Sequence, residues 1–279
     1  KESDFVPIFH GYLGTDIDTT SVPGEITLTV NDLAKRLQRA YIDIPRTYGS
    51  NAGIPAETVM QQIINDNLGT GQVTLYCPIS PGFMIRPYNL EYKTVWDALQ
   101  EIADQIGWDV RYKYDSATGQ FRLTFFKPPR NKIVPDLDLS DLDSIYAEAL
   151  NINDASIRNK ITVVYRNAST GQRASVTVQD LASQQEFWVQ PMEVEESSTS
   201  LIDTAAEATA MANAIVHDLK DLSSTTQIEA PLLWPIEVFD LLRVTNPRVR
   251  NEAENYAVEA YEHIFGGGKF RTTIRARGT

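Results

Sequence analysis

The sequence predicts an α+β fold, with strand-rich ends and a middle that contains helices. Residues 26–30 and the segment from residue 223 onward show the alternation of apolar residues that is typical of strands. Between them, residues 55–68, 94–107 and 203–219 carry apolar residues at helical spacing. The strands and helices do not alternate in the regular β-α-β order of a parallel sheet, which favours α+β over α/β.

The first fifty residues predict two strands and a short helix. Residues 5–17 are apolar and strand-like, and Gly11 and Gly14 within them indicate a bend or bulge. Residues 25–30 alternate, so one face of that strand is expected to be buried. Asn31 or Asp32 then stands where a residue that caps a helix N-terminus is expected.

Two amphipathic helices follow. The first begins at Pro55 and ends at Gly69, and a strand is predicted at 73–76. The second has a capping Thr94 and a terminating Gly107. Its apolar stripe consists of Val95, Leu99, Ile102 and Ile106. The alternation at 110–114 and 121–125, with a turn at 115–119, predicts a β-hairpin directly after this helix.

The two prolines within 127–130 mark a boundary or the exit of a strand. Residues 136–153 are compatible with either helix or strand. Strands are predicted at 161–165 and 176–178, joined by a turn at 167–171, and a short helix at 180–187. Residues 193–200 are expected to form a polar loop.

The longest predicted helix begins near Asp203, where Thr204 and Glu207 match a capping box. Its expected buried face consists of Ala205, Ala208, Ala212, Ile215 and Leu219. The rest of the chain is expected to be all-β. The predicted strands are 227–233, 239–244, 256–263 and 270–276, and Gly266–Gly268 joins the last two.

Composition excludes several classes of protein. The 279 residues carry a formal net charge of −12, which argues against a duplex-binding surface over the whole molecule. The single cysteine, Cys77, excludes an intrachain disulfide framework and a multi-cysteine zinc site. No apolar run approaches the ~20 residues of a membrane span. Because the chain starts at Lys1 rather than methionine, we expect it to be a processed or shortened form.

Two segments resemble ligand-binding loops but lack essential residues. Residues 266–269 read Gly-Gly-Gly-Lys, yet His263 and Phe270 occupy positions where a phosphate-binding loop needs glycine and a hydroxyl residue. Residues 136–143 alternate oxygen-bearing side chains as a calcium loop does, without its central glycine and distal glutamate. A hairpin turn and a solvated linker are the better interpretations, and weak calcium binding at Asp136–Asp143 stays open.

No catalytic constellation is recognisable. Glu193, Glu195 and Glu196, with Trp188 as a platform, could suggest a glycosidase, but such enzymes place two carboxylates across a substrate and usually take them from separate segments. The motifs of zinc proteases and of serine hydrolases are absent. We therefore predict no catalytic, cofactor-binding or metal-binding residues and no enzymatic activity.

Charge is distributed unevenly along the chain. Residues 174–219 contain no Lys or Arg but eight acids, whereas residues 111–132 contain six bases and one acid, Asp115. The eight acids are Asp180, Glu186, Glu193, Glu195, Glu196, Asp203, Glu207 and Asp218. Such asymmetry can steer complementary subunits together or line a cavity with one sign of charge.

The order of segments resembles a known family. Residues 98–108 read ALQEIADQIGW and lead into the 112–125 hairpin, matching the "ALxxIAxxxGW" helix of phage tail hub proteins. Residues 159–163 read NKITV, like the "NKVTV" strands of the same family, and a helix at 204–219 and a closing β-segment at 230–245 follow. The chain is therefore similar to the baseplate-hub, late-control-protein-D-like and siphophage tail-tip proteins over most of its length.

The resemblance implies a domain organisation. It predicts β-barrel-like domains of the tail-hub type with an inserted α/β domain that contains helices. Residues 1–50 would belong to the first barrel, 51–132 to the insertion and 133–279, with the long helix 203–221, to the second barrel. Similar hubs have more β-sequence before the counterpart of Phe5, so we expect the first barrel to be incomplete or completed by residues outside this sequence. Similar proteins also often carry Gly-Asp where this chain has Phe239-Asp240.

The resemblance also implies a function. Such hubs form a homotrimeric ring that joins the tail tube to the tip and leaves a channel for DNA ejection. The implied partners are a distal tail or tube protein, the tape measure and a tip or fibre protein, with DNA only in passage. The implied location is the virion tail, assembled in the cytoplasm of the bacterial host. Like charges would keep DNA from adhering to such a channel, and the candidate lumen-facing acids are Asp180, Glu186, Glu193, Glu195 and Glu196.

Two other functions remain compatible with the residues. The chain could be a carbohydrate-binding adhesin that uses exposed aromatics such as Trp188 and Trp234, although core packing is the commoner role of tryptophan in strands. It could also be the non-catalytic portion of a tail-associated cell-wall hydrolase.

Overall fold

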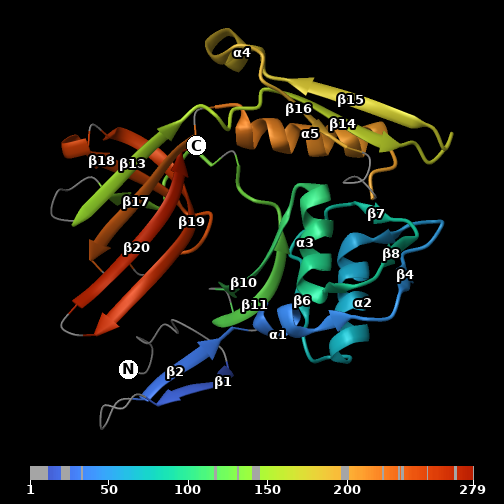
Figure 1. The fold of residues 1–279 in the computed structure, drawn as a ribbon, viewed down its shortest axis with the longest axis horizontal. Coiled ribbons are helices and arrows are strands. Elements are labelled where there is room, and N and C mark those ends of the chain that lie inside the picture. Colours follow the sequence, from blue (N-terminus) through green and yellow to red (C-terminus); the bar gives the residue numbers. More distant parts are fainter. Residues whose placement is uncertain are drawn as a thin grey trace. The chain divides into compact units, whose positions relative to one another are not determined.

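The chain forms two compact units in the computed structural model (Figure 1). Unit 1 consists of Lys1–Lys127 and Ser197–Asp203, and unit 2 of Pro128–Glu196 and Thr204–Thr279. The chain therefore passes between the units three times. The structure describes residues 12–19, 26–32, 34–115, 118–130, 132–139, 145–195, 201–221, 223–231, 233, 236–249, 251–266 and 269–278.

Unit 1 begins with an antiparallel pair of strands, β1 (Tyr12–Thr19) and β2 (Ile26–Asn31). A register shift within β1 agrees with the predicted bend. The side chain of Asp32 then accepts a hydrogen bond from the Lys35 backbone N–H, 3.3 Å away, where α1 (Ala34–Arg39) begins. The predicted capping of this helix is confirmed, whereas residues 5–11 lie outside the described residues.

The core of unit 1 forms around α2 (Ala56–Leu68) and α3 (Val95–Ile106). Thr94 Oγ1 accepts the N–H of Asp97 at 3.0 Å, and Gly107 ends α3 in the left-handed region with φ 73°. Both signals were predicted from the sequence. The buried face of α3 consists of Val95, Ala98, Leu99, Ile102, Ala103 and Gln105.

Three pairs of very short antiparallel strands frame these helices. They are β3 (Tyr41–Ile42) with β9 (Lys93–Thr94), β4 (Arg46–Tyr48) with β8 (Tyr88–Leu90), and β5 (Ile54–Pro55) with β7 (Met84–Ile85). Next to them Gly49 has φ 83°, and a Cβ there would lie 2.3 Å from the carbonyl oxygen of Arg86. Only glycine fits this approach of two backbones.

The predicted hairpin of unit 1 is formed by β10 (Asp109–Asp115) and β11 (Gln120–Phe126). A short strand, β6 (Leu75–Tyr76), extends it in parallel beside β11. One face of the hairpin is buried through Val110, Leu123 and Phe125. The opposite face carries its charged residues, since successive side chains of a strand point to opposite sides.

Unit 2 contains a six-stranded sheet in the order β12-β18-β19-β20-β17-β13. Its strands are β12 (Leu137–Leu139), β13 (Ala147–Asn153), β17 (Ser223–Pro231), β18 (Leu241–Asn246), β19 (Asn251–Gly266) and β20 (Lys269–Gly278). A 3-10 turn, Pro247–Val249, follows β18. All neighbours are antiparallel except β12 and β18. The ambiguous stretch at 136–153 thus contributes two edge strands.

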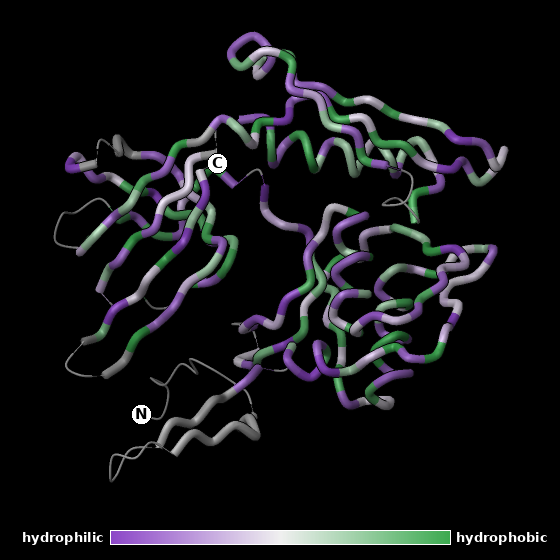
Figure 2. Tube along the Cα trace, in the orientation of Figure 1, coloured by the Kyte–Doolittle hydropathy of each residue, from purple (hydrophilic) through white to green (hydrophobic). Residues whose placement is uncertain are grey.

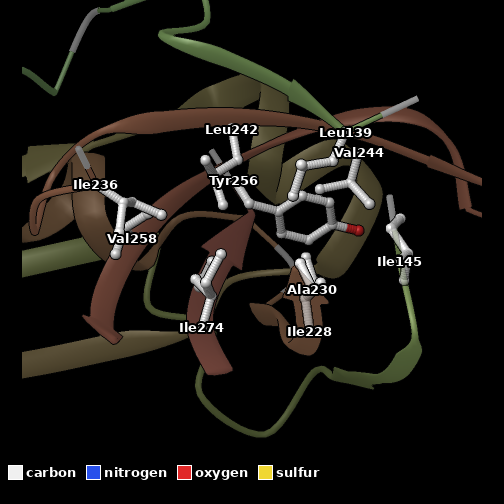
Figure 3. Close-up of a cluster of buried hydrophobic side chains, with 11 residues drawn as sticks. Leu139, Ile145, Ile228, Ala230, Ile236, Leu242, Val244, Tyr256, Val258 and Ile274 are labelled. Carbon is white, nitrogen blue, oxygen red and sulfur yellow. The ribbon is translucent and has the colours of Figure 1, made fainter. Parts of the chain in front are cut away.

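The sheet curves around a hydrophobic core (Figure 3). The fully buried ring of Tyr256 lies among the aliphatic side chains of this core. The other members are Leu139, Ile145, Ile228, Ala230, Ile236, Leu242, Val244, Val258, Ile274 and Ala276. Hydrophobic and hydrophilic residues alternate along β20 (Figure 2), as expected for a sheet with one buried face.

A second sheet of unit 2 has the order β15-β14-β16, formed by β15 (Arg173–Gln179), β14 (Lys160–Arg166) and β16 (Pro191–Val194). The long helix α5 (Ala205–Leu219) packs against β14 and β15 (Figure 1). The predicted hairpin of β14 and β15 is confirmed. The predicted loop at 193–200 is wrong at its start, because Glu193 and Val194 pair with β14 as a parallel strand.

The N-terminus of α5 has both hydrogen bonds of the predicted capping box. Its buried face is different from the one predicted. Only Ala208 and Ala212 of that set are buried, whereas Ala205 is exposed. Met211 and Val216 complete the buried face. The sequence pattern was ambiguous because α5 is apolar on more than one side, so the sheet decides which stripe is covered.

Residues 201–203 belong to unit 1 although both flanking segments belong to unit 2. Leu201 and Ile202 are 5% and 1% exposed. The buried side chain of Gln105 accepts the N–H of Leu201 at 2.8 Å, and Arg86 forms an ion pair with Asp203 at 3.0 Å. This short segment is therefore firmly fixed within unit 1.

The turn before β18 contains a strained residue. Phe239 has φ 73°, in the left-handed region that favours glycine. Its N–H donates to the carbonyl of Val258 at 2.8 Å, and the Asp240 carboxylate accepts the N–H of Glu237 at 2.7 Å. The position where similar proteins often carry Gly-Asp is thus a turn whose first residue needs positive φ.

Candidate functional site

The acids predicted to face a lumen lie in or beside the second sheet of unit 2. Asp180 caps the short helix α4 (Leu181–Phe187), since its carboxylate accepts the N–H of Ser183 at 2.9 Å. The same carboxylate forms an ion pair with Lys220 at 3.3 Å. The hydrogen bond from Ser183, and then Lys220, hold the pKa of Asp180 below its ordinary value. Asp180 therefore has a structural role in this layer.

The remaining predicted acids differ in their environments. Glu193 lies on β16 and forms an exposed ion pair with Arg173 at 3.5 Å. Glu186 on α4 and Glu195 just after β16 are exposed. Glu196 lies outside the described residues. The structure thus brings four of the five acids into one layer of unit 2, and two of them form ion pairs.

Beneath this surface lies a fully buried polar residue, Asn159. Its side-chain amide donates to Ser183 Oγ at 3.1 Å and to the carbonyl of Trp188 at 2.8 Å. Its side-chain oxygen accepts the N–H of Gln190 at 2.8 Å. Its backbone N–H donates to the carbonyl of Gln190, and its backbone carbonyl accepts the N–H of Asp180, both at 3.0 Å. One buried amide therefore fixes the segment between α4 and β16.

This segment presents an exposed tryptophan. Trp188 is 82% exposed and has φ 64°, an uncommon and costly conformation for a bulky residue. Leu181, Val189 and Met192 are also exposed, on the same short stretch of chain. We call Leu181, Trp188, Val189 and Met192, together with the adjacent Glu186, the Trp188 surface.

The segments that resembled ligand loops have structural roles where they are described. Asp136 binds Lys132 and accepts the N–H of Leu241 at 2.8 Å. Although partial burial opposes it, these two partners lower the pKa of Asp136. Asp138 is exposed, and residues 140–144 lie outside the described residues. Gly266 and Lys269 pair at the end of the β19–β20 hairpin, in agreement with the predicted turn.

The described part of the chain has neither a cluster of metal-binding side chains nor a helix that could span a membrane. It contains no group of three or more His, Cys, Asp or Glu side chains placed to hold a metal ion. None of its helices combines the length and hydropathy needed to span a bilayer.

Similarity to solved structures extends over nearly the whole chain. The tail protein of Neisseria meningitidis MC58 aligns with 96% of this chain and 79% of its own, at 15% identity and a TM-score of 0.67. The 43 kDa tail protein of prophage MuSo2 from Shewanella oneidensis aligns with 94% of this chain and 76% of its own, at 13% identity and a TM-score of 0.63.

The E. coli c3393 protein is described as a component of the type VI secretion system with structural similarity to the T4 bacteriophage tail proteins gp27 and gp5. It aligns with 97% of this chain and 60% of its own, at 9% identity and a TM-score of 0.56. This chain has the tail-hub fold. The resemblance found in the sequence is thereby confirmed for the fold. No protein-family model and no curated protein sequence matches the chain.

The burial of Asn159 is a feature of this structure that the sequence did not indicate. In the sequence, Asn159 is the first residue of the NKITV pattern, and that pattern does not predict its burial. A polar residue directly before an apolar strand is usually a surface residue. Its burial depends on α4, β16 and the end of α5, which all reach it from distant parts of the sequence.

Proposed function

We propose that this chain is a structural subunit of a phage or prophage tail, located at the tail tip or baseplate hub. The observation that carries the proposal is the tail-hub fold, which spans 94–97% of this chain in three independent alignments. Residues 1–50 would contribute to a first barrel, 51–132 would form the insertion, and 133–279 would form a second barrel. The role is non-catalytic.

Three copies would form a ring that joins the tail tube to the tip and leaves a channel for DNA. The partners would be a tube protein, the tape measure and a tip or fibre protein, and the site of action would be the virion after assembly in the host cytoplasm. The exposed Glu186 and Glu195, with Asp180, Glu193 and Glu196, would line the channel. Acidic walls repel the phosphate backbone and so keep DNA moving.

The test is the absolute mass of the chain in solution, measured by light scattering after size exclusion over a range of concentrations. A trimer of the 31.2 kDa chain, with a central channel in electron micrographs, is the expected result. A chain that stays monomeric at every concentration, also after extension upstream of Lys1, would contradict the ring. A ring structure with Glu186 and Glu195 on its outer wall would contradict the channel lining alone.

A second candidate function rests on Trp188. A tryptophan that is 82% exposed can stack on a sugar ring, so the chain would act as a carbohydrate-binding adhesin. Trp234, the other proposed aromatic, lies outside the described residues. Binding to a glycan array that is lost in Trp188→Ala would favour this function over the first.

A further inference from the structure

The two units are connected by the chain at three places, and two of these links lie among the described residues. One link joins Lys127 to Pro128, and the other joins Asp203 to Thr204. Compact units that are joined by short links move relative to each other unless a large apolar interface holds them together. Because a link also restricts this motion, the points where it is anchored in each unit determine which rotations remain.

The link between Asp203 and Thr204 has almost no slack. On the side of unit 1, residues 201–202 are buried and Asp203 forms its ion pair with Arg86. On the side of unit 2, the N–H of Thr204 donates to the Glu207 carboxylate at 3.0 Å within the capping box. The peptide group between Asp203 and Thr204 is planar and is held by the cap of α5. Rotation at this link is therefore confined to the backbone dihedral angles of Asp203.

The other link is anchored at the opposite end of α5. Phe126, the last residue of β11, pairs with Asp109 in unit 1. Shortly after it, the Arg130 guanidinium binds both carboxylate oxygens of Asp218, at 2.8 and 3.0 Å, in the last turn of α5. Residues 127–129 between these anchors include two prolines, and each proline ring fixes one backbone dihedral angle. This link is thus short and stiff.

Two separated anchor points define an axis. The helix α5 has 15 residues, so its two ends lie about 22 Å apart. A body that is attached at one point can turn in every direction, whereas a body attached at two separated points can turn only about the line through them. The third link, residues 196–200, lies outside the described residues. A link of five residues extends to about 17 Å at most, so it limits how far such a rotation goes and leaves its axis unchanged.

We propose that α5 is the axis of a hinge between the two units. The backbone of Asp203 is one pivot and residues 127–129 are the other. A rotation about this axis leaves the capping box and the Arg130–Asp218 pair intact, so it breaks none of the contacts that anchor the links. In an assembly, one unit could stay bound to a neighbour while the other turns along a defined path. The hinge is a property of a single chain, so it goes beyond the proposed ring and does not depend on it.

The test measures distances between two spin labels by pulsed electron spin resonance on the full chain. Cys77→Ser removes the native thiol, and labels are attached to introduced cysteines at exposed positions. The axial pair, Lys127→Cys with Ala205→Cys, places one label on unit 1 at one pivot and one on unit 2 at the other pivot. An excess of unlabelled chain keeps labelled copies apart in any oligomer.

A transverse pair, Thr70→Cys with Phe270→Cys, places its labels far from the pivots. Thr70 is exposed and follows the end of α2, about 20 Å from the β5–β7 pair where this helix begins. Phe270 is exposed at the opposite end of β20 from Arg277, which donates to Asp218. Within unit 2, β20 extends away from α5 (Figure 1).

The two pairs should give different distance distributions. A turn of about 30° moves a point that lies about 20 Å from the axis by about 10 Å, whereas points on the axis do not move. We therefore expect a narrow distribution for the axial pair and one about twofold broader or more for the transverse pair. The same sites supply the matched controls. Thr70→Cys with Lys127→Cys lies within unit 1, and Ala205→Cys with Phe270→Cys lies within unit 2, so both should give narrow distributions.

Removing one anchor should release the axis. Arg130→Ala frees residues 127–129 from Asp218, and we expect the distribution of the axial pair to become about twofold broader. Arg46→Ala is the control variant, because it breaks a 3.0 Å ion pair with Asp66 that lies entirely within unit 1. It should leave the axial distribution unchanged.

Each other outcome would overturn the hinge. Narrow distributions for both pairs would mean that the units are held rigidly, and broad distributions for both would mean that they move without a common axis. An axial distribution that Arg130→Ala leaves narrow would remove Arg130 and Asp218 as an anchor. None of these results depends on the mass of the chain in solution, so the hinge and the proposed ring stand or fall separately.

Discussion

Arg130 and Asp218 form a two-point ion pair between the start of unit 2 and the end of α5. Arg130 Nε lies 2.8 Å from one carboxylate oxygen of Asp218 and Nη2 lies 3.0 Å from the other. Arg277 on β20 donates to the backbone carbonyl of the same Asp218. The end of α5 is thus joined to both sheets of unit 2, because α5 itself packs against the second one.

Breaking this pair should destabilise unit 2 only modestly. Both side chains are partly exposed, at 20% and 39%, so we expect Arg130→Ala and Asp218→Asn each to cost about 1 kcal/mol. Urea unfolding of the two variants and of the double variant gives the coupling between them. A double variant whose loss equals the sum of the single losses would contradict a direct interaction.

Replacing Asn159 should have a larger effect. Asn159→Ala leaves the Trp188 carbonyl and the Gln190 N–H without their side-chain partner and removes one of the two hydrogen bonds of the Ser183 hydroxyl, at a cost of about 2–3 kcal/mol. Chemical denaturation measures the loss. Asn151→Ala, at an exposed position on β13, is the matched control and should change stability by less than about 0.5 kcal/mol. Equal effects of the two variants would refute the anchoring role of Asn159.

The strain at Phe239 predicts an order of stability between two variants that both lose the ring. Phe239→Gly should be more stable than Phe239→Ala by about 1 kcal/mol, because only glycine adopts φ 73° without steric cost. The unfolding free energies of the two variants decide the matter. Alanine as the more stable replacement would mean that the turn relaxes to another conformation.

Gly49 should tolerate no side chain. Gly49→Ala would place a Cβ 2.3 Å from the Arg86 carbonyl oxygen, and we expect a loss of at least about 2 kcal/mol. Gly82→Ala is the control, since Gly82 also has positive φ, 68°, but no atom lies within 4 Å of the added Cβ. Backbone strain alone should limit its loss to about 1 kcal/mol. The difference in thermal midpoint between the variants reports the close approach at Gly49.

The lowered pKa of Asp180 predicts a pH dependence. The folded state holds this carboxylate ionised more strongly than the unfolded state, where its pKa is about 3.9. Its contribution is therefore complete above that value and is lost as the pH falls through the lower folded pKa. Asp180→Asn keeps the helix cap but does not titrate. Urea midpoints measured from neutral pH to about pH 3 should fall less steeply in Asp180→Asn than in the exposed control Asp154→Asn. Equal slopes would contradict the prediction.

The helices and strands that the sequence predicted well are those with clear local signals, such as helix caps and alternating apolar residues. Thr94 and Gly107 mark the two ends of α3, and Thr204 with Glu207 marks the start of α5. Each of these residues forms a hydrogen bond with a backbone group a few positions away. The three pairs of two- and three-residue strands in unit 1 were not predicted, since so few residues cannot show an alternating pattern. The β14–β15 hairpin was predicted from the alternating apolar residues at 161–165 and 176–178, which are parts of its two seven-residue strands.

The candidate site was predicted less completely than the fold. The sequence identified Trp188 and the acidic stretch around it. It could not indicate that Asn159 is buried, since that depends on contacts 24 and 31 residues away along the chain. The sequence also showed that Phe239 departs from a family pattern. The reason for that pattern, the positive φ of the turn, is visible only in the folded structure.

The burial of residues 201–203 in unit 1 has a consequence for the gene. The coding sequence of unit 1 is interrupted by that of unit 2, so no single crossover can exchange one unit for a homologous one intact. A crossover between the codons for Lys127 and Pro128 would leave Leu201 and Ile202 packed against a foreign unit 1, with a Gln105 counterpart they did not evolve with. Recombination is therefore expected to keep the two units together as one inherited piece.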